Sequence, residues 1–465
     1  MNFSSIKHIH LVGIGGIGMS GIAEILISQG FTVSGSDLNE SETTERLAQV
    51  GVQIMIGHHE NHILDADVVV YSSAVKPLEN PETKAAIEQH KPIIRRAEML
   101  SELSRLNYCL AVAGTHGKTT TTSMVGMALM KAGMDPTVIV GGRLRGLGGS
   151  NARLGQGDWI VLEADEYDRS FLQLLPTVAI ITNVEADHLD IYSDLDDVCG
   201  AFTEFANKVP FYGTACVCLD DAGVRSILPR ISKVVVTYGL GNDCDVRAIN
   251  VTFQERSSTF TLVHHNQTLG TITLKVPGEH NVRNALAACA AGLVCHTPFE
   301  ALRDALSEFT GVYRRFEIKG EVNGILVVDD YAHHPTEVRS TLAAARRGWN
   351  RRIVAVFQPH TYTRTRDFAK DFAASFTDAD VLIVTDVYAA RETPIKGISG
   401  ATIADAARAA GHPNVHYVPS LHAVPATLVN LTNKGDMVMT LGAGDVWKLA
   451  RDLTTPVAHG YSSYS

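Results

Sequence analysis

The chain has 465 residues, of which 45% are hydrophobic and 19% are charged, and its formal net charge at pH 7 is −10. This composition excludes a disordered or fibrous chain, because it supplies enough apolar material for several cores. The negative charge also disfavours a general binder of nucleic acids or anionic membranes, whose affinity for phosphate depends on a cationic surface. At about 150 residues per domain, the length predicts three domains.

Signals for export or membrane insertion are absent from the sequence. Residues 1–12 contain no basic stretch followed by a long apolar run, and no segment approaches the ~18 uninterrupted apolar residues of a membrane span. The 7 cysteines are odd in number and form no C-x-x-C pair, which favours reduced core residues over disulfides or a zinc site. We therefore predict a cytoplasmic protein that does not insert into a membrane.

Apolar strands, glycine-rich turns and amphipathic helices alternate along the chain, a pattern typical of parallel α/β architecture. Three blocks each begin their own series of strands and loops. We therefore predict an α/β fold with domains at residues 1–107, 108–310 and 311–465. Residues 234–276 are rich in strands and are expected to form an antiparallel extension of the second domain.

The first glycine loop follows a strand expected at residues 8–12 and precedes a helix expected at residues 19–28. Its G-x-G-x-x-G pattern lets backbone N–H groups at a helix start approach a diphosphate. Asp37 ends the next strand at about the spacing where a carboxylate meets a ribose. The diphosphate is therefore expected to contact Gly13, Gly15, Gly16 and Gly18. This pattern does not identify the nucleotide, so an NAD-dependent dehydrogenase is one alternative.

The second glycine loop lies between a strand expected at residues 109–113 and a further helix. Its sequence, GTHGKTT, is a shortened form of G-x-x-x-x-G-K-T, because position 112 is Val rather than Gly. The parts that bind phosphate remain: a nest of backbone N–H groups, Lys118 for the β- and γ-phosphates, and the Thr119 hydroxyl for Mg²⁺. The sequence therefore predicts a triphosphate site.

Acidic residues follow the strands expected at residues 159–162 and 178–182. The carboxyl ends of parallel strands meet at one edge of a sheet, so these residues are expected beside the phosphate loop. Many carboxylates next to a triphosphate would repel it unless a divalent cation intervened, and we infer Mg²⁺. Glu163 and His188, each near the end of an apolar strand, are the favoured ligands.

Several motifs now occur in one order, and together they resemble the Mur ligases, the ATP-dependent amide-forming enzymes of peptidoglycan assembly. In the second block these are GTHGKTT from 114, EADE from 163, NVEADH from 183 and PGEHNVRNA from 277. In the third block they are RRFE from 314, DDYAHHPTE from 329, QPHTYTRTR from 358 and DVYAA from 386. With GIGGIGMS from 13, the set is most similar to the branch of the family that acts on UDP-N-acetylmuramate and L-alanine.

The resemblance implies a Rossmann-like N-terminal domain for the UDP-sugar, a P-loop-type central ATPase domain and a Rossmann-like C-terminal domain for the amino acid. It adds Met19 and Ser20 to the UDP-sugar site. The implied ATP-binding residues are Gly114, Thr115, His116, Gly117, Lys118, Thr119, Thr120, His280, Asn284, Arg315 and Asp330. The implied amino-acid pocket contains Tyr331, His333, His360 and Arg364, and Thr361 stands where many members have Arg.

The implied reaction joins L-alanine to the carboxylate of UDP-N-acetylmuramate through an acyl phosphate formed from ATP. Lys118, Glu163, His188 and His333 are the expected catalytic residues. Two Mg²⁺ ions are expected, with Thr119, Glu163 and His188 as ligands, and His333 is the candidate base for the amino group. The expected partners are small molecules, and the expected state is a monomer or homodimer.

Two further alternatives stay open at this point. The first is the ligase of the same family that attaches a preformed tripeptide to the same sugar nucleotide, which carries a similar two-histidine motif. The second is a nucleotide-switched binding protein that uses the phosphate loop without forming a bond. The choice between the tripeptide and L-alanine as substrate distinguishes the first alternative from the ligase described above. ATP hydrolysis that does not depend on a UDP-sugar and an amino acid would indicate the second alternative.

Overall fold

The structure of the protein is a computed structural model that describes residues 6–72, 74–105, 107–141, 151–187, 191–390 and 392–455. The chain divides into two compact units. Unit 1 consists of Met1–Val251, Thr259–Leu274 and Asn281–Thr310, and unit 2 consists of Thr252–Ser258, Lys275–His280 and Gly311–Ser465. The described residues form three sheets, which confirms the predicted α/β fold with three domains. The predicted boundaries at 107/108 and 310/311 stay predictions.

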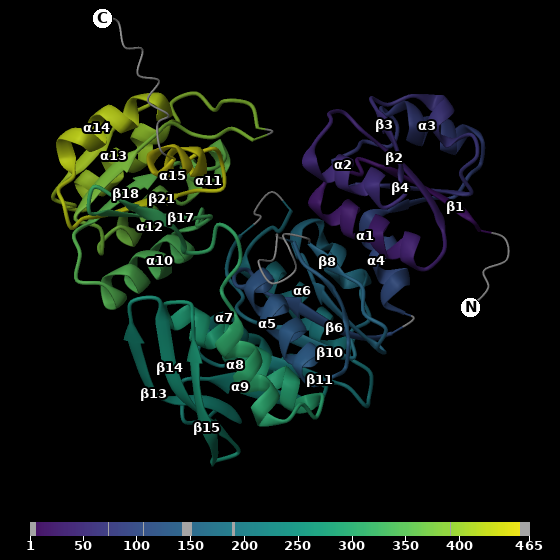
Figure 1. The fold of residues 1–465 in the computed structure, drawn as a ribbon, viewed down its shortest axis with the longest axis horizontal. Helices are drawn as coiled ribbons and strands as arrows, with labels where there is room; N and C mark the ends of the chain where they lie inside the picture. The colour runs from purple at the N-terminus through teal and green to yellow at the C-terminus, as the bar shows by residue number, and fades with distance from the viewer. Residues whose placement is uncertain are drawn as a thin grey trace, which may run out of the picture. The chain divides into compact units, whose positions relative to one another are not determined.

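The first sheet, purple to blue in Figure 1, has the order β3-β2-β1-β4-β5 and is parallel throughout. Its strands are β1 (His8–Val12), β2 (Thr32–Asp37), β3 (Gln53–Ile56), β4 (Val68–Tyr71) and β5 (Ile93–Arg95). Its helices are α1 (Ile17–Ser28), α2 (Glu42–Gln49), η1 (Glu60–Ile63), α3 (Pro81–Glu88) and α4 (Arg96–Ser104). The strand order reverses between β1 and β4. Ligands of parallel sheets bind beyond the carboxyl ends of the strands at such a reversal, and the first glycine loop begins there.

The second sheet has the order β15-β14-β13-β12-β11-β10-β6-β9-β7-β8. Its first strands are β6 (Tyr108–Ala113), β7 (Thr137–Ile139), β8 (Ala152–Arg153), β9 (Trp159–Glu163), β10 (Val178–Ile181), β11 (Thr214–Cys218) and β12 (Val235–Gly239). Its helices are α5 (Lys118–Lys131), η3 (Tyr167–Gln173), α6 (Leu195–Asn207), α7 (Ala222–Ile227), η4 (Leu228–Arg230), α8 (Glu279–Val294) and α9 (Phe299–Glu308). Since β6 lies parallel between β10 and β9, the phosphate loop after β6 is flanked by the carboxyl ends of both neighbours.

The last three strands of this sheet form the predicted antiparallel extension. They are β13 (Val246–Gln254), β14 (Ser257–His264) and β15 (Gln267–Leu274), and each pairs with the next. Two-residue connections join them, a length that suffices for antiparallel neighbours but not for parallel ones. His265 and Asn266 form the second connection with φ of 46° and 63°, as tight hairpin turns require.

The sheet of unit 2 has the order β16-β17-β21-β18-β19-β20, and only the β16–β17 pair is antiparallel. Its strands are β16 (Glu317–Val322), β17 (Ile325–Asp330), β18 (Ile353–Phe357), β19 (Val381–Val384), β20 (Val415–Tyr417) and β21 (Met437–Leu441). Its helices are α10 (Pro335–Gly348), α11 (Tyr362–Asp367), α12 (Ala369–Ser375), α13 (Gly400–Ala409), η5 (Leu421–Ala423), α14 (Val424–Leu431) and α15 (Trp447–Thr454). The loops after β17 and β18 therefore leave the same edge of the sheet.

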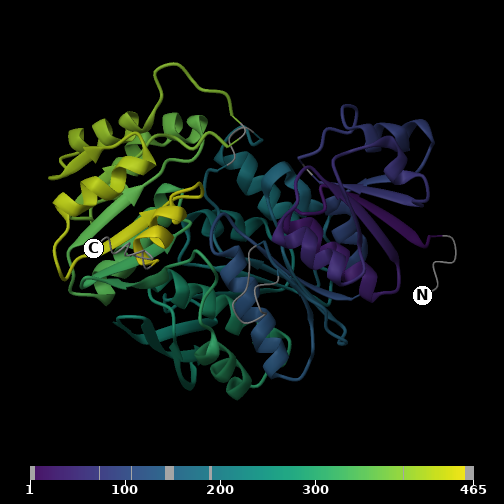
Figure 2. The ribbon, with the colours of Figure 1, turned by 45° about the horizontal axis from the view of Figure 1, so that its top comes forward.

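Helices cover both faces of this sheet (Figure 2, green to yellow). One face packs against α10, α12 and α13 through residues such as Leu342 and Phe372, and the other against α14 and α15 through Leu428 and Leu449. Burial on two faces explains the continuous apolar runs in the sequence, because such strands do not alternate between apolar and polar residues.

All seven cysteines are buried and unpaired, as predicted. Within the described residues, no helix combines the length and the apolar character needed to cross a membrane.

Candidate functional site

The phosphate loop connects β6 to α5 and depends on two glycines with positive φ. Gly114 has φ +139° and Gly117 has φ +82°, conformations that L side chains rarely adopt. A Cβ on Gly114 would lie 1.9 Å from the Thr182 Oγ1, so no side chain fits there. The His116 N–H donates to the Asn183 Oδ1 at 2.7 Å, which ties the loop to the residues after β10. The loop therefore has a fixed shape in front of a helix N-terminus, as anion binding requires.

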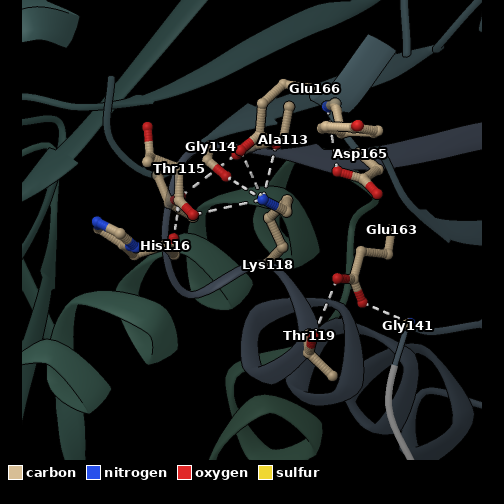
Figure 3. Close-up of polar contacts among 12 residues, drawn as sticks. Ala113, Gly114, Thr115, His116, Lys118, Thr119, Gly141, Glu163, Asp165 and Glu166 are labelled. Carbon is tan, nitrogen blue, oxygen red and sulfur yellow. Dashed lines mark hydrogen bonds and ion pairs between the residues drawn. The ribbon is translucent and has the colours of Figure 1, made fainter. Parts of the chain in front are cut away.

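Lys118 is the first residue of α5, and oxygen atoms surround its ammonium (Figure 3). The Nζ donates to both carboxylate oxygens of Glu166 at 2.9 and 2.7 Å and to the Gly114 carbonyl at 2.8 Å. Burial lowers the pKa of Lys118, but the charges of Glu166, Asp165 and Glu163 outweigh burial and raise the pKa above its ordinary value. The side chain is therefore positively charged at neutral pH. Sequence reasoning missed Glu166 as its counter-ion, although Glu166 belongs to the EADE motif.

Thr119 and Glu163 lie together beside the start of α5 (Figure 3). The Thr119 Oγ1 donates to the Glu163 Oε1 at 3.0 Å, and the Gly141 N–H donates to the Oε2 at 2.6 Å. Burial raises the pKa of Glu163, although the charge of Lys118 opposes this shift. A hydroxyl next to a carboxylate that burial destabilises fits Mg²⁺, which prefers hard oxygen ligands. The third predicted ligand, His188, lies outside the described residues.

Three other predicted ATP-binding residues of unit 1 also lie at the phosphate loop. The Thr115 Oγ1 accepts a hydrogen bond from the Glu185 N–H at 3.0 Å. Thr120 is buried in the first turn of α5. The Asn284 Oδ1, from α8, lies 2.5 Å from the position that a Cβ on Gly117 would take. The structure thus brings Thr115, Thr120 and Asn284 to the loop, whereas His280 belongs to unit 2.

The first glycine loop is anchored to the end of β2. The Gly13 and Ile14 N–H groups donate to the Ser36 carbonyl at 2.8 and 3.0 Å, and the Gly15 N–H donates to the Asp37 Oδ2 at 2.9 Å. Asp37 therefore contacts the loop itself, next to where α1 begins. The Met19 and Ser20 side chains are almost fully buried, and the Ser20 Oγ donates to the Asn151 Oδ1 at 3.4 Å. Four of the six loop residues are glycines, so backbone N–H groups can approach a diphosphate there.

A pocket of about 240 Å³ in unit 1 adds residues that sequence reasoning missed. Its lining includes Tyr71, Arg95, Arg96 and Asp168. The Arg96 Nη1 lies 2.2 Å from the position of a Cβ on Gly18, so this guanidinium borders the first glycine loop. Asp168 has φ +54°, a strained conformation that clusters at functional sites. The sequence signal that could have found them is the Arg95–Arg96 pair, where β5 ends and α4 begins at the carboxyl edge of the first sheet.

In unit 2, four aromatic side chains gather beyond β17 and β18. The ring centroids of Tyr331 and His333 are 5.1 Å apart, those of His333 and His360 are 5.7 Å apart, and those of His360 and Tyr388 are 5.8 Å apart. The structure thus brings together three of the four residues predicted for the amino-acid pocket. Tyr388, from the DVYAA motif, joins them. Arg364 lies in α11, which starts two residues after His360.

The two neighbouring arginines before β16 have different surroundings. Arg314 donates to the Gly442 carbonyl at 2.6 Å and to Asp329 at 3.2 Å, so its guanidinium supports the fold. Arg315 donates to the Glu337 Oε1 at 3.3 Å. Burial lowers the pKa of Arg315, but the nearby acids Glu337 and Asp330 outweigh burial and raise the pKa. Of the pair, Arg315 is the better candidate for a phosphate contact.

Asp330 is a buried acid at the end of β17. Its carboxylate accepts hydrogen bonds from the Phe316 and Ala332 N–H groups, both at 2.7 Å. Burial raises the pKa of Asp330 to about 6, although Arg315 and both hydrogen bonds favour the charged form. Asp330 therefore ties the turn before β16 to the loop after β17.

Thr361 is a strained residue between His360 and α11. Its φ is +65°, which is unusual for a β-branched side chain. The Glu392 Oε2 accepts hydrogen bonds from the Tyr362 and Thr363 N–H groups at 2.6 and 3.0 Å, and these bonds hold the first turn of α11. Sequence reasoning did not identify Glu392, because its partners lie about thirty residues earlier in the chain.

Three family models match the chain. They are the Mur ligase family catalytic domain at residues 8–108, the Mur ligase middle domain at residues 112–292, and the Mur ligase glutamate ligase domain at residues 314–444. Together they span most of the described residues, and each matches one of the three sheets.

The chain is 54% identical over 444 residues to the UDP-N-acetylmuramate--L-alanine ligase of Salinibacter ruber, covering 95% of this chain and 93% of the relative. It is 52% identical to the protein of the same name from Syntrophotalea carbinolica, covering 97% and 98%. Among solved structures, it is similar to a UDP-N-acetylmuramate-alanine ligase from Thermotoga maritima, with a TM-score of 0.80, 31% identity and coverage of 96% and 98%. A murein peptide ligase from Psychrobacter arcticus gives a TM-score of 0.70 and 27% identity, with coverage of 97% and 100%.

Proposed function

The chain belongs to the Mur ligase family, and we propose that it joins L-alanine to the carboxylate of UDP-N-acetylmuramate, with conversion of ATP to ADP and phosphate. The observation that carries this proposal is the phosphate loop of unit 1, where Lys118 and the Thr119–Glu163 pair meet. A dehydrogenase or a simple nucleotide switch has no use for this loop together with a separate diphosphate loop. The product would be UDP-N-acetylmuramoyl-L-alanine, an intermediate of peptidoglycan synthesis.

The first chemical step activates the sugar carboxylate. A carboxylate is a poor acyl donor because its leaving group would be oxide, so one of its oxygens attacks the γ-phosphate of ATP and gives an acyl phosphate. Lys118 stabilises the charge on the transferring phosphoryl group, and the N–H groups of the loop hold the other phosphates. For this role Lys118 leaves Glu166 and turns toward the phosphates.

The second step forms the amide. The neutral amine of L-alanine attacks the acyl phosphate, and the tetrahedral intermediate expels inorganic phosphate. We assign the amino-acid pocket to Tyr331, His333, His360 and Arg364, and His333 to removal of the ammonium proton, because a neutral imidazole suits that task at neutral pH. The Tyr331 ring, which meets His333 edge-on with ring centroids 5.1 Å apart, gives the small substrate an aromatic wall.

Mg²⁺ is the metal that we propose for the site, as two ions with Thr119, Glu163 and His188 as ligands. Mg²⁺, when bound, supplies positive charge that neutralises the triphosphate and the sugar carboxylate. The contribution of the protein is the hydroxyl of Thr119 and the carboxylate of Glu163, already 3.0 Å apart. We also propose a cytoplasmic location, where nucleotide substrates are available, and a monomer or homodimer.

Phosphate release with a panel of amine substrates tests the proposed function. The purified protein is mixed with ATP, Mg²⁺ and UDP-N-acetylmuramate, and then with L-alanine, L-serine, glycine or the tripeptide. We expect release that depends on the UDP-sugar and is fastest with L-alanine. Activity with the tripeptide alone would assign the chain to the peptide-recycling ligases, which the similarity to the Psychrobacter structure keeps as the second candidate. Release without any amine would contradict ligase chemistry.

A further inference from the structure

Glu337 makes contacts that place it between a cation and a predicted catalytic base. It lies in the first turn of α10, and only 10% of its side chain is exposed. Its Oε1 accepts from the Arg315 Nη1 at 3.3 Å. Its Oε2 accepts from the His333 N–H at 3.0 Å and lies 3.2 Å from the His333 Nδ1. One carboxylate therefore fixes both the backbone and the ring of His333.

The Nδ1 of His333 faces a second acceptor as well. The Tyr331 carbonyl oxygen lies 3.0 Å from it. A carbonyl and a carboxylate can only accept, so Nδ1 must carry a proton to satisfy them. In a neutral imidazole, a proton on Nδ1 leaves the basic lone pair on Nε2. The contacts therefore select one tautomer of His333, with Nε2 as the proton acceptor.

We propose that Glu337 is a positioning residue that holds His333 in the tautomer whose Nε2 takes the proton from the alanine ammonium. This inference rests on the proposed function and deepens it. As the proton moves to Nε2, the nitrogen lone pair forms the C–N bond to the acyl carbon, and the bond from this carbon to the phosphate oxygen then breaks. The second proton lost by the nitrogen leaves with the phosphate. The imidazolium is stabilised by Glu337 and returns its proton to solvent.

The charged and titratable groups around His333 come from several elements of unit 2. They are Glu337 in α10, Tyr331 and Asp330 at the end of β17, Arg315 before β16 and His360 after β18. The negative charge of Glu337 favours the imidazolium form of His333, and Arg315 weakens this effect because it shares the carboxylate. Removal of the Glu337 charge should therefore lower the pKa of His333.

A purely structural role for Glu337 is the competing explanation. An acidic residue in the first turn of a helix stabilises the helix N-terminus, and an ion pair with an arginine increases this stabilisation. Under that explanation, loss of Glu337 would damage every activity of the site alike. Under the proposal, it would damage the step that needs a base more than the step that does not.

A comparison of two nucleophiles distinguishes these explanations. Hydroxylamine attacks an acyl phosphate without a base, because its conjugate acid is far more acidic than an alkylammonium ion. We compare alanine ligation with hydroxamate formation, both with ATP and UDP-N-acetylmuramate, in Glu337→Gln, Glu337→Asp and the unaltered protein. Gln keeps an oxygen for the His333 N–H but loses the charge, whereas Asp keeps the charge. Asp436→Asn is the matched control.

The control fits because Asp436 has similar contacts without a histidine. Its carboxylate accepts from the Asn433 N–H at 2.8 Å and from the Arg352 Nη1 at 3.0 Å. It precedes β21, so it lies at the edge of the sheet opposite to His333. We expect alanine ligation and hydroxamate formation to change in parallel in Asp436→Asn.

In Glu337→Gln, we expect alanine ligation to fall at least about tenfold more than hydroxamate formation. The acid limb of the pH profile for ligation should move to lower pH, and Glu337→Asp should restore its position. Equal losses in both reactions, or an unmoved acid limb in a folded Glu337→Gln protein, would overturn the proposal. If the unaltered protein forms hydroxamate but does not ligate alanine, the proposed function fails instead, and the two failures are thus distinguishable.

Discussion

The two glycine loops of unit 1 share a strand–loop–helix arrangement but obtain their positive charge differently. The phosphate loop is followed directly by its own cation, Lys118. The first loop contains no basic residue between Gly13 and Gly18, and a cation reaches it from Arg96 at the start of α4. A phosphoryl group that is transferred needs a cation fixed to the loop, whereas a diphosphate that is only bound needs its charge neutralised. This difference is what we expect if the nucleotide in the phosphate loop reacts, whereas the nucleotide in the first glycine loop only holds the substrate in place.

Removal of Lys118 should have the largest effect. We expect Lys118→Ala to lower ligation by about 10³-fold or more, because no other group of the loop carries the transition-state charge. Binding of UDP-N-acetylmuramate, measured by calorimetry, should be unchanged. Lys131→Ala is the control, since Lys131 ends the same helix and pairs with Glu308 on the surface. Ligation by Lys118→Ala at near-normal rates would refute the role of this residue.

The two loops should also differ in their tolerance of a methyl group. A Cβ on Gly114 would lie 1.9 Å from the Thr182 Oγ1, whereas a Cβ on Gly13 would lie 3.0 Å from the Ser72 Oγ. We expect Gly114→Ala to raise the KM for ATP by about 100-fold, equivalent to about 3 kcal/mol of strain. Gly13→Ala should raise the KM for the UDP-sugar by only about tenfold. The reverse order of the two effects would contradict the stated geometry.

The cation at the first loop should matter for binding rather than for chemistry. We expect Arg96→Ala to weaken UDP-N-acetylmuramate binding by about tenfold, the usual size of one charge-assisted hydrogen bond. The rate at saturating substrates should change much less. Arg105→Ala is the matched control, because Arg105 follows α4 and pairs with Glu102 at the surface. A fall in the saturated rate with unchanged affinity would show that Arg96 acts in the reaction instead.

The smallest expected effect concerns Glu82, a buried carboxylate behind the first loop. It accepts from the Ser36 Oγ at 2.6 Å, and the carbonyl of Ser36 in turn anchors the loop. Burial raises the pKa of Glu82, but the nearby His10 ring and hydrogen bonds from Ser36 and His62 outweigh burial and lower the pKa to about 2. This stabilisation is complete above the ordinary pKa of 4.5 and is lost as the pH falls toward about 2.

Thermal unfolding of Glu82→Gln tests this effect. We expect the Tm to fall by about 5 °C at pH 7, and the difference from the unaltered protein to shrink as the pH is lowered below 4.5. Glu79→Gln, a nearby surface change, should leave the Tm unaltered. An equal destabilisation at every pH would show that the charge of Glu82 does not contribute.

The local parts of this site could be predicted from the sequence. The strand, loop and helix around Lys118 follow from apolar runs and glycine spacing, and the structure confirms each element within about two residues. The proximity of Glu163 to the phosphate loop could be predicted from one rule, that the carboxyl ends of parallel strands lie at the same edge of a sheet. The buried cysteines and the antiparallel extension could be predicted equally well, because they depend on composition and on short-range turns.

Contacts between distant segments could not be predicted in the same way. The position of Arg96 after β5 places it at the carboxyl edge of the sheet but does not show that it borders Gly18. Likewise, nothing in Arg314 and Arg315 shows that only the second faces Glu337. The bonds of Glu392 to the first turn of α11 likewise depend on how two loops meet in space. Such pairings are set by tertiary packing, which no single-residue propensity records.

In the proposed reaction, ATP phosphorylates the sugar carboxylate before the amine arrives. Transfer of ¹⁸O from the carboxylate of labelled UDP-N-acetylmuramate to inorganic phosphate tests it most directly. With ATP and L-alanine, each phosphate released should carry one labelled oxygen, because the carboxylate oxygen bridges carbon and phosphorus in the acyl phosphate. Phosphate released without the label, while the amide forms, would contradict it.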